Sequence, residues 1–426
     1  MIFMKNEVVR VRQTIVEKMF SKHCGKMVYA GECVIPTVDY LIGTDTKSLL
    51  AIEIFKKENL TLNFPLEKVF FVFDHYSPCT HSTMANQHLT IREFCDKYGI
   101  KYFETGEGIG YQLIPENSII SPGNLVCVSD SHAPTFGGMN VLGLAIGSSE
   151  FAAVLATGKM WFMVPETILV RLKGNLPAYV SSKDIALYLA SQLGAEGADF
   201  SAIEFAGPGL SELSLPARYT LCNMAADIGA IAALMPGDEV LKEYFAEDHF
   251  VNADPDAKYK EVVEIDVGKI EPLVAVPHNI DLVKKARELK DVKVHQVFLG
   301  ACTNGRLEDL RVAAKILKGK KIAKGLRFYI GPASRNVFLQ AVKEGVMETL
   351  TEAGATILAP GCSLCVGLSG LGIPGDGEVV VSTANRNFQG RLGNSNSFIY
   401  ITSPAVAATS AMLGYIADPR EIMGVV

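Results

Sequence analysis

The stretch "VHQVFLGACTNGRLEDLRVAAKIL", residues 294–317, joins an apolar run to a helical pattern through a short polar turn. The apolar run is typical of a buried strand. After the turn, apolar residues recur on one helical face, namely Leu307, Leu310, Ala314 and Leu317. The stretch therefore predicts a strand–loop–helix unit of an α/β fold, with Cys302 in the loop at the carboxyl end of the strand.

Five further apolar runs predict buried strands of the same kind: "KVFFVFDH" (68–75), "NLVCVSDSH" (124–132), "LRFYIGP" (326–332), "ATILAPGC" (355–362) and "EVVVSTANR" (378–386). Helical patterns occur in "TIVEKMFSKH" (14–23) and "SLLAIEIFKKEN" (48–59). Four of the predicted strands end in the polar groups DH, DSH, CTN and NR. Because ligands gather outside the carboxyl ends of strands in open parallel sheets, we expect the functional site at these ends. After the DSH group, a glycine-rich segment is expected to cross into a helix.

The chain is long enough for two or three domains, at 426 residues with 49% hydrophobic and 20% charged residues. Changes in composition near "GNLPAYVSS" and "VPHNIDLVKK" predict the domain edges. The predicted domains are residues 1–175, 176–284 and 285–426.

The bulk composition argues against several classes of partner. A net charge of -6 without a basic stripe disfavours nucleic acid. No apolar run reaches the length of a membrane span, and the first 20 residues lack the apolar core of a signal peptide. The nine cysteines are odd in number and scattered, unlike a disulfide framework. These features together predict a cytoplasmic protein.

Two of the cysteines, Cys362 and Cys365, lie three positions apart in "APGCSLCVG" (359–367), and Cys302 is the best candidate for a third metal ligand. Structural zinc normally takes four protein ligands, and no fourth ligand has suitable spacing. Three cysteines that hold an iron–sulfur cluster leave one iron free for substrate or water. The thiols leave two alternatives open: a catalytic zinc site, or a buried turn pair to which Cys302 is unrelated.

Six stretches resemble the isopropylmalate dehydratase group of the aconitase superfamily, in family order: "FDHYSP", "SPGNLVCVSDSHAPTFGG", "CNMAADIGA", "GACTNGRLEDLRVAAKILKGKK", "APGCSLCVG" and "STANRNFQGRLG". The resemblance covers nearly the whole chain. It implies an aconitase-like three-domain α/β/α architecture and a 4Fe-4S cluster in which one iron is not ligated by cysteine. It also implies a large subunit that lacks the swivelling domain, so that a separate small subunit supplies the rest of the active site.

The resemblance assigns roles to residues of this chain. The implied cluster ligands are Cys302, Cys362 and Cys365, and the implied catalytic residues are Asp74, His75, Asp130, His132 and Asp227. Residues implied to bind the substrate are Ser131, Asn223, Asn385, Arg386 and Arg391. These residue types suit acid–base catalysis on a carboxylate substrate. A carboxylate fixes the tautomer of a neighbouring imidazole, and a guanidinium can bind a substrate carboxylate with two hydrogen bonds. The implied substrate is a small di- or tricarboxylate.

The chain departs from the family pattern at several positions. Tyr111 stands where a histidine is usual, and Asp227 stands where a glutamate is usual. Ser129, Ala133 and Ala301 replace the usual glycine, threonine and serine. The predicted function is the isomerisation of 3-isopropylmalate and 2-isopropylmalate in leucine biosynthesis. The alternatives are homoaconitate, citramalate or 2,3-dimethylmalate as substrate, or a divergent paralogue that binds the cluster without catalysis.

Overall fold

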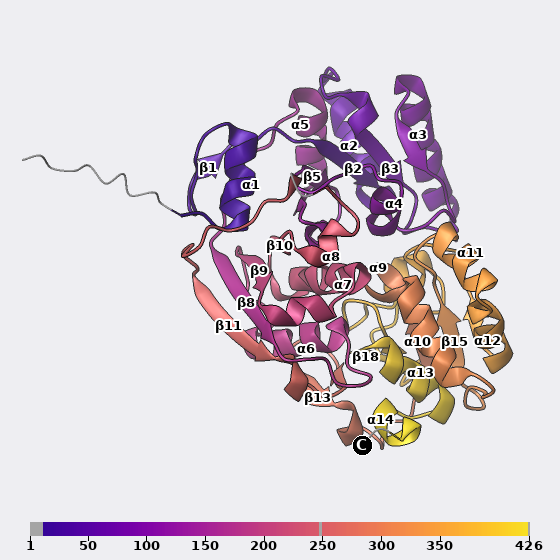
Figure 1. The fold of residues 1–426 in the computed structure, drawn as a ribbon. Coiled ribbons are helices and arrows are strands. Elements are labelled where there is room, and N and C mark those ends of the chain that lie inside the picture. The colour runs from indigo at the N-terminus through magenta and orange to yellow at the C-terminus, as the bar shows by residue number, and fades with distance from the viewer. Residues whose placement is uncertain (1–11, 247–248, 425–426) are drawn as a thin grey trace, which may run out of the picture.

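Three larger β-sheets, each covered by helices, and one two-stranded sheet are present in the computed structural model, which describes residues 12–246 and 249–424. In Figure 1 the first sheet and its helices occupy the top, the second lies at the lower left and the third at the lower right. Part of the segment used for the signal-peptide prediction, residues 1–11, lies outside the described residues.

The first sheet has five parallel strands in the order β4-β3-β2-β5-β6. Its strands are β2 (Tyr40–Thr44), β3 (Val69–Val72), β4 (Lys101–Phe103), β5 (Leu125–Val128) and β6 (Leu142–Ala145). Its helices are α2 (Asp45–Lys57), α3 (Ser82–Tyr98), α4 (Gly110–Glu116) and α5 (Ser148–Thr157). Because side chains alternate along a strand, Phe71 packs in the core with α2, α3 and α5, whereas Phe70 and Val72 pack in the core that contains α4.

A short two-stranded sheet and one helix lie beside this unit. Strand β1 (Cys33–Val34) pairs antiparallel with β7 (Phe162–Met163), and helix α1 is Ile15–Cys24. Thr14 and Glu17 form a reciprocal capping box that fixes where α1 begins. The buried side of α1 places Ile15, Met19 and Phe20 in the core of the first unit.

The second sheet has four parallel strands in the order β10-β9-β8-β11. The strands are β8 (Thr167–Lys173), β9 (Ala202–Ala206), β10 (Ala232–Leu234) and β11 (Glu261–Asp266). The helices are α6 (Ser182–Leu193), α7 (Leu215–Ala225) and α8 (Glu239–Lys242). Strand β8 precedes the predicted domain edge at residue 175, although it pairs with the strands that follow this edge.

The third sheet has seven strands in the order β13-β12-β18-β17-β14-β15-β16. Strand β12 pairs antiparallel with β13 and β18, and the other neighbours are parallel. The strands are β12 (Leu273–Ala275), β13 (Val283–Lys285), β14 (Gln296–Leu299), β15 (Arg327–Ile330), β16 (Thr356–Ile357), β17 (Val379–Ser382) and β18 (Phe398–Thr402). The helices are α9 (Ala301–Asn304), α10 (Leu307–Leu317), α11 (Arg335–Lys343), α12 (Val346–Ala353), α13 (Pro404–Leu413) and α14 (Pro419–Met423).

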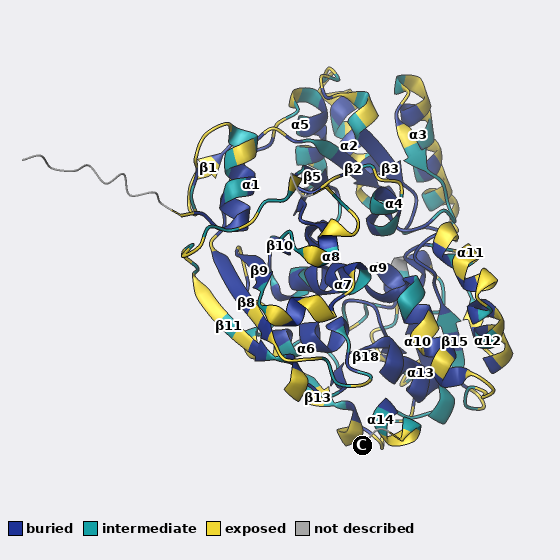
Figure 2. Cartoon of the chain, in the orientation of Figure 1, coloured by how far each residue is buried: buried dark blue, intermediate teal, exposed yellow. Residues whose placement is uncertain are grey.

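All six strands predicted from apolar runs are present, as β3, β5, β14, β15, β16 and β17, and the helix predicted after Cys302 is α10. The remaining strands, among them β2, β4, β8 and β18, were not predicted, and strand β6 interrupts the segment that we expected to cross directly into a helix. The domain boundaries stay predictions. Strand β12 lies before the predicted edge at residue 284 and β13 spans it, although both belong to the third sheet. Figure 2 shows most strands buried, apart from the largely exposed edge strand β11, and shows exposed residues on α3, α11 and α12. Within the described ranges, no helix combines the length and apolar character that crossing a membrane requires.

Glu204 of β9 is a buried carboxyl group that makes stability depend on pH. It accepts hydrogen bonds from the backbone N–H of Val16 and from the hydroxyl of Tyr259, both at 3.1 Å. Burial raises the pKa of Glu204 from an ordinary 4.5 to about 7. Between these two pH values the folded chain keeps a proton that the unfolded chain releases. The free energy of unfolding therefore falls as the pH rises from 4.5 to about 7, and the contribution of this group is constant above that range. Glu204→Gln is expected to remove this change in the free energy of unfolding, which amounts to about 3 kcal/mol.

The measurement is the thermal unfolding midpoint at about pH 5 and about pH 8, in the native chain and the variant. Glu264→Gln is the matched control, because Glu264 is a half-exposed carboxylate on the same sheet. We expect the control to keep the native difference between the two pH values. An unchanged difference in Glu204→Gln would show that this carboxyl group ionises normally in the folded chain.

Candidate active site

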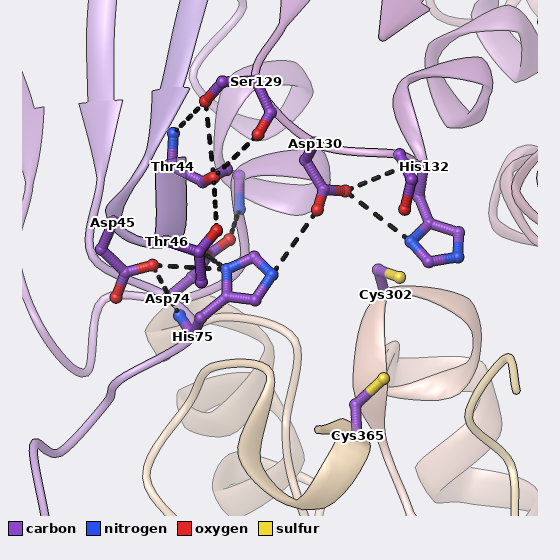
Figure 3. Close-up of polar contacts among 12 residues, drawn as sticks. Thr44, Asp45, Thr46, Asp74, His75, Ser129, Asp130, His132, Cys302 and Cys365 are labelled. Atoms are coloured by element: carbon purple, nitrogen blue, oxygen red, sulfur yellow. Dashed lines mark hydrogen bonds and ion pairs between the residues drawn. The ribbon is translucent and has the colours of Figure 1, made fainter. Parts of the chain in front are cut away.

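The carboxyl ends of β3 and β5 bring two predicted acid–base pairs together (Figure 3). Oδ1 of Asp74 lies 2.7 Å from Nδ1 of His75, and Oδ2 of Asp74 accepts the backbone N–H of Gly110 at 2.9 Å. On the other side of the ring, Nε2 of His75 lies 3.6 Å from Oδ2 of Asp130. The imidazole is thus held by a carboxylate at each ring nitrogen, which fixes its orientation.

Asp130 is also held by Tyr111. Its Oδ1 accepts the hydroxyl of Tyr111 at 2.7 Å and the backbone N–H of His132 at 3.0 Å. Burial, reinforced by Asp130, raises the pKa of Tyr111 well above its ordinary value of 10. The phenol therefore stays protonated at neutral pH, so it donates a hydrogen bond but does not exchange its proton as a histidine would.

Asp227 and Arg386 connect the second and third units to the first. Asp227 lies in the turn that follows α7, and Arg386 lies in the loop that follows β17. Oδ1 of Asp227 accepts Nε–H of Arg386 at 2.6 Å and lies 3.4 Å from Nε2 of His132. Nη2 of Arg386 donates to Oγ of Ser131 at 3.2 Å. Oδ2 of Asp227 is buried and has no hydrogen-bond partner among the described residues.

These contacts keep the carboxylates charged. Burial alone would raise the pKa of Asp130, but His132 and His75 hold it well below its ordinary value. Burial likewise opposes ionisation of Asp227, yet His132 and Arg386 lower its pKa. In turn, Asp227 and Asp130 raise the pKa of His132 against the effect of burial. Asp130 and Asp227 therefore stay charged beside imidazoles that bind protons more tightly than usual, whereas burial raises the pKa of Asp74.

The three predicted thiols lie at the carboxyl ends of two strands of the third sheet. Cys302 lies in α9 directly after β14, and Cys362 and Cys365 lie in the loop after β16. Sγ of Cys302 and Sγ of Cys365 lie 3.7 and 3.8 Å from one atom, Oδ1 of Asn385. The two sulfurs therefore both lie next to this amide oxygen.

A close backbone approach joins the thiol loop to the first sheet. The N–H of Cys362 donates to the carbonyl oxygen of Asp74 at 2.8 Å. Gly361, with φ +154°, permits this contact, because a Cβ there would lie 3.0 Å from the same oxygen. Cys362 is thereby fixed beside the pair Asp74 and His75.

Two polar side chains contact the other sulfurs. Nδ2 of Asn223 donates to Sγ of Cys302 at 3.1 Å, and Nη2 of Arg391 donates to Sγ of Cys365 at 3.4 Å. Burial raises the pKa of Cys302 to about 12. Burial also opposes ionisation of Cys365, but Arg391 lowers the pKa of that thiol below its ordinary value. Asn223 and Asn385 also hydrogen-bond to each other, so the sulfurs sit in a connected polar network.

One cavity of about 90 Å³ is lined by all of the predicted site residues except Asp227, Asn223 and Asn385. Tyr111 and Val366 complete its lining. The three exceptions lie behind the wall, where Asp227 contacts His132 and Arg386 and the two asparagines contact the sulfurs. The structure thus joins all of the predicted residues, although only ten of them face the cavity directly.

The thiols fit an iron–sulfur cluster better than a single ion. Among the described residues, the one group close enough to share an ion is Asp74, His75 and Cys362, whose ligand atoms lie within 4.8 Å of one another. That group includes only one of the three thiols that face the cavity. The cysteines that hold a cluster bind separate irons, so three thiolates spread around a cavity suit a cluster, and soft sulfur ligands favour iron–sulfur chemistry. The remaining six cysteines do not line the cavity.

Asp45 and Lys183 support the site but were not predicted from the sequence. Asp45 accepts the backbone N–H groups of His75 at 3.2 Å and Tyr76 at 2.9 Å. Nζ of Lys183 donates to the carbonyl oxygens of residues 383 and 384 at 2.8 and 2.9 Å, directly before Asn385. Burial lowers the pKa of Lys183 to about 8. Of these two residues, only Asp45 could have been identified from the sequence, because it is an acidic residue that follows a short apolar run.

Comparisons with known proteins agree with this geometry. The family model described as aconitase family (aconitate hydratase) matches residues 45–414. The 3-isopropylmalate dehydratase large subunit of Elusimicrobium minutum is 44% identical over 418 residues, which cover 96% of this chain and 99% of that protein. The probable methanogen homoaconitase large subunit of Methanosarcina mazei is 44% identical over 395 residues, with 91% and 100% covered. Thermococcus kodakaraensis aconitase X (holo-form) has a TM-score of 0.51 at 14% identity, with 91% of this chain and 94% of that chain covered, which supports the fold alone.

The fold and these matches define an enzyme of the hydro-lyase class, which removes or adds water at a carbon–oxygen bond. More particularly, the chain belongs to the aconitase family. Membership of this family implies an iron–sulfur cluster. The predicted α/β fold class, the predicted family and the predicted enzyme class are confirmed.

Proposed function

We propose that this chain is the large subunit of a 4Fe-4S hydro-lyase that interconverts 3-isopropylmalate and 2-isopropylmalate in leucine biosynthesis. Cys302, Cys362 and Cys365 hold the cluster, and one iron is not ligated by cysteine. The observation that carries the proposal is the shared cavity, which places these thiols beside paired imidazoles and carboxylates and beside two arginines. The dehydratase named in Elusimicrobium minutum supports the choice of substrate.

The acid–base residues are arranged for proton transfer at two points of the cavity. When bound, the cluster offers a Lewis-acidic iron to the hydroxyl group that leaves. His75 and His132 line the cavity, and a carboxylate holds each of them in a fixed orientation. Each can deliver a proton to a departing oxygen or return one during rehydration. Asp74 and Asp227 orient these imidazoles and stabilise their charged forms.

Two guanidinium groups in the cavity suit a carboxylate substrate. Arg386 and Arg391 both line the cavity, and a planar guanidinium can bind a carboxylate through two parallel hydrogen bonds. Ser131 lies 3.2 Å from Arg386 and offers a further hydroxyl donor to the same group. Asp227 lies behind the cavity wall, where it holds the cavity residues His132 and Arg386 in place. These contacts favour a small di- or tricarboxylate over a neutral ligand.

A separate small subunit completes the active site in this proposal. The relatives in Elusimicrobium minutum and Methanosarcina mazei are both named as large subunits. The variable end of the substrate is then recognised largely by the partner chain, at the boundary between subunits. The enzyme works in the cytoplasm and binds neither nucleic acid, which its net charge of -6 disfavours, nor a membrane.

Homoaconitate is the second candidate substrate, because the homoaconitase subunit of Methanosarcina mazei is as similar to this chain as the dehydratase subunit is. Citramalate and 2,3-dimethylmalate share the same malate-like core. A cluster-binding paralogue without catalysis is the remaining alternative, motivated by Tyr111 and Asp227. Asp227 nevertheless contacts both His132 and Arg386, so the shorter carboxylate still reaches its partners.

The test is an activity panel with anaerobically purified chain and its small partner. We expect isomerisation of isopropylmalate, a cluster absorbance, and bound iron and sulfide in equal amounts. A colourless protein without iron would contradict the cluster, whereas a loaded protein that acts on none of the four substrates would contradict the enzyme. Activity that appears only after Tyr111→His and Asp227→Glu would favour the non-catalytic paralogue.

Tyr111→Phe is expected to lower kcat about 10- to 100-fold while KM stays nearly constant. The variant removes a hydrogen bond to the charged Asp130, and such a bond contributes about 1.5–3 kcal/mol. Steady-state kinetics of the loaded enzyme give the result. Tyr219→Phe is the matched control, since Tyr219 is a buried tyrosine that does not line the cavity. Equal activity of native enzyme and Tyr111→Phe would exclude a role for this phenol in holding Asp130.

A further inference from the structure

Outside the cavity, a thiol, an imidazole and a carboxylate follow one another in contact. Sγ of Cys79 lies 3.3 Å from Nδ1 of His88, and Nε2 of His88 lies 3.0 Å from Oδ2 of Asp45. Because Nε2 faces a carboxylate, it carries the ring proton and leaves Nδ1 as an acceptor toward the thiol. The order of nucleophile, base and orienting carboxylate is the one that activates thiols and hydroxyls in catalysis.

The thiol is accessible although its two partners are not. Cys79 is partly exposed, whereas His88 and Asp45 are each 1% exposed. Burial, with Asp45 adding to it, raises the pKa of Cys79, so the sulfur keeps its proton at rest. The reactivity of this thiol therefore depends on the neighbouring imidazole accepting that proton as the sulfur reacts.

Asp45 also contacts His75, which lines the active-site cavity (Figure 3). Its Oδ1 lies 3.3 Å from Nδ1 of His75 and accepts the backbone N–H of the same residue at 3.2 Å. One buried carboxylate is thus shared between His88, which faces the thiol, and His75, which lines the cavity. A change at the thiol that displaces His88 also disturbs the carboxylate that holds His75.

The loop that carries the thiol packs against the loop that carries the predicted cluster ligands. Oγ1 of Thr80 donates to the carbonyl oxygen of Ser369 at 2.8 Å. Sγ of Cys79 already lies 3.4 Å from the carbonyl oxygen of Tyr76 and 3.3 Å from His88. An oxygen atom added to the sulfur of Cys79 therefore forces either His88 or the loop that carries Cys79 to move.

We propose that Cys79 is a modification site for small thiol oxidants of the peroxide class, and that its oxidation inactivates the enzyme through His88, Asp45 and His75. The effect on catalysis rests on the proposed function, whereas the modification itself does not. The geometry that carries the proposal is the contact of a partly exposed thiol with a base whose orienting carboxylate also binds an active-site histidine.

The chemical step is balanced with hydrogen peroxide as the oxidant. The thiol proton passes to Nδ1 of His88 while the sulfur of Cys79 attacks one peroxide oxygen. A sulfur–oxygen bond forms and the oxygen–oxygen bond breaks. The leaving hydroxide takes the proton from His88 and becomes water. The sulfur is oxidised by two electrons to a sulfenic acid, and the peroxide is reduced by two electrons.

The first test needs no activity. The loaded enzyme is exposed briefly to hydrogen peroxide, its sulfenic acids are trapped with dimedone, and labelled cysteines are quantified by peptide mass spectrometry. Cys33 is the internal control, because it is an exposed thiol on β1. We expect Cys79 to be labelled faster than Cys33, and we expect His88→Gln to lower the labelling of Cys79 at least about tenfold. Glutamine keeps a donor toward Asp45 but removes the ring acceptor. Slower labelling of Cys79 than of Cys33, or no effect of His88→Gln, would overturn the site.

The second test separates this effect from damage to the cluster. Activity and cluster absorbance are followed together after addition of peroxide to native enzyme and to Cys79→Ala, which is expected to keep native activity. In the native enzyme, activity should fall ahead of the absorbance. In Cys79→Ala the two should fall together. Identical curves in both proteins would overturn the link to His75. If the loaded chain has no activity at all, the proposed function fails, and the labelling experiment still decides the modification.

Discussion

Cys302→Ala is expected to abolish both the cluster absorbance and measurable activity. The thiol lies in α9 at the carboxyl end of β14, lines the cavity, and is one of three thiolates available to the cluster. Loss of an outer-shell partner of a metal ligand already costs about 10- to 100-fold, so loss of a ligand should cost more than about 100-fold. The measurements are iron and sulfide content, the visible spectrum and turnover of isopropylmalate after anaerobic reconstitution with the small partner.

Cys127→Ala is the matched control for this variant. Cys127 is a fully buried thiol in β5 that does not line the cavity. The same loss of a sulfur atom from a packed interior occurs in both variants, so stability effects are comparable. We expect the control to keep the cluster and the activity. A Cys302→Ala protein that keeps full iron content and turnover would remove Cys302 from the ligand set.

The strands that the sequence predicts correctly are uninterrupted apolar runs, such as "VFFV" in β3 and "LVCV" in β5. Strands β2 and β6 were missed because each contains a glycine, which weakens the strand pattern. The structure gives the reason for both glycines. A Cβ on Gly43 would lie 2.6 Å from the ring of Phe71, and a Cβ on Gly143 would lie 2.1 Å from the carbonyl oxygen of Ala133. The close packing that requires glycine thus conceals the strand from sequence patterns.

Because strand β2 was not predicted, Asp45 at its carboxyl end was not predicted either. Asp45 follows β2 in the way that Asp74 follows β3 and Asp130 follows β5. The rule that functional residues follow strand ends selects these carboxylates once all three strands are known. Lys183 is different in kind, because its partners lie about 200 residues further along the chain. A sequence pattern within one helix cannot show which distant backbone a lysine contacts.

Arg386→Lys is expected to lower kcat/KM by about 100- to 1,000-fold, corresponding to roughly 3–4 kcal/mol of transition-state stabilisation. The guanidinium donates from Nε to Asp227 at 2.6 Å and from Nη2 to Ser131 at 3.2 Å while it lines the cavity. Lysine keeps the charge, but a single ammonium group cannot reproduce the two-point geometry of the guanidinium. The carboxylate of Asp227 then loses its closest donor, and the substrate loses a planar partner.

Steady-state kinetics at saturating and limiting substrate distinguish the two roles of Arg386. A rise in KM alone would mean that the side chain only binds the substrate, whereas a fall in kcat as well would mean that it also positions Asp227 and His132. Because its Nε contacts Asp227 directly, we expect both parameters to change. Arg335→Lys is the control, since Arg335 is an exposed residue at the start of α11 that does not line the cavity. Near-native kcat/KM in Arg386→Lys would show that charge alone, without the planar geometry, is sufficient at this position.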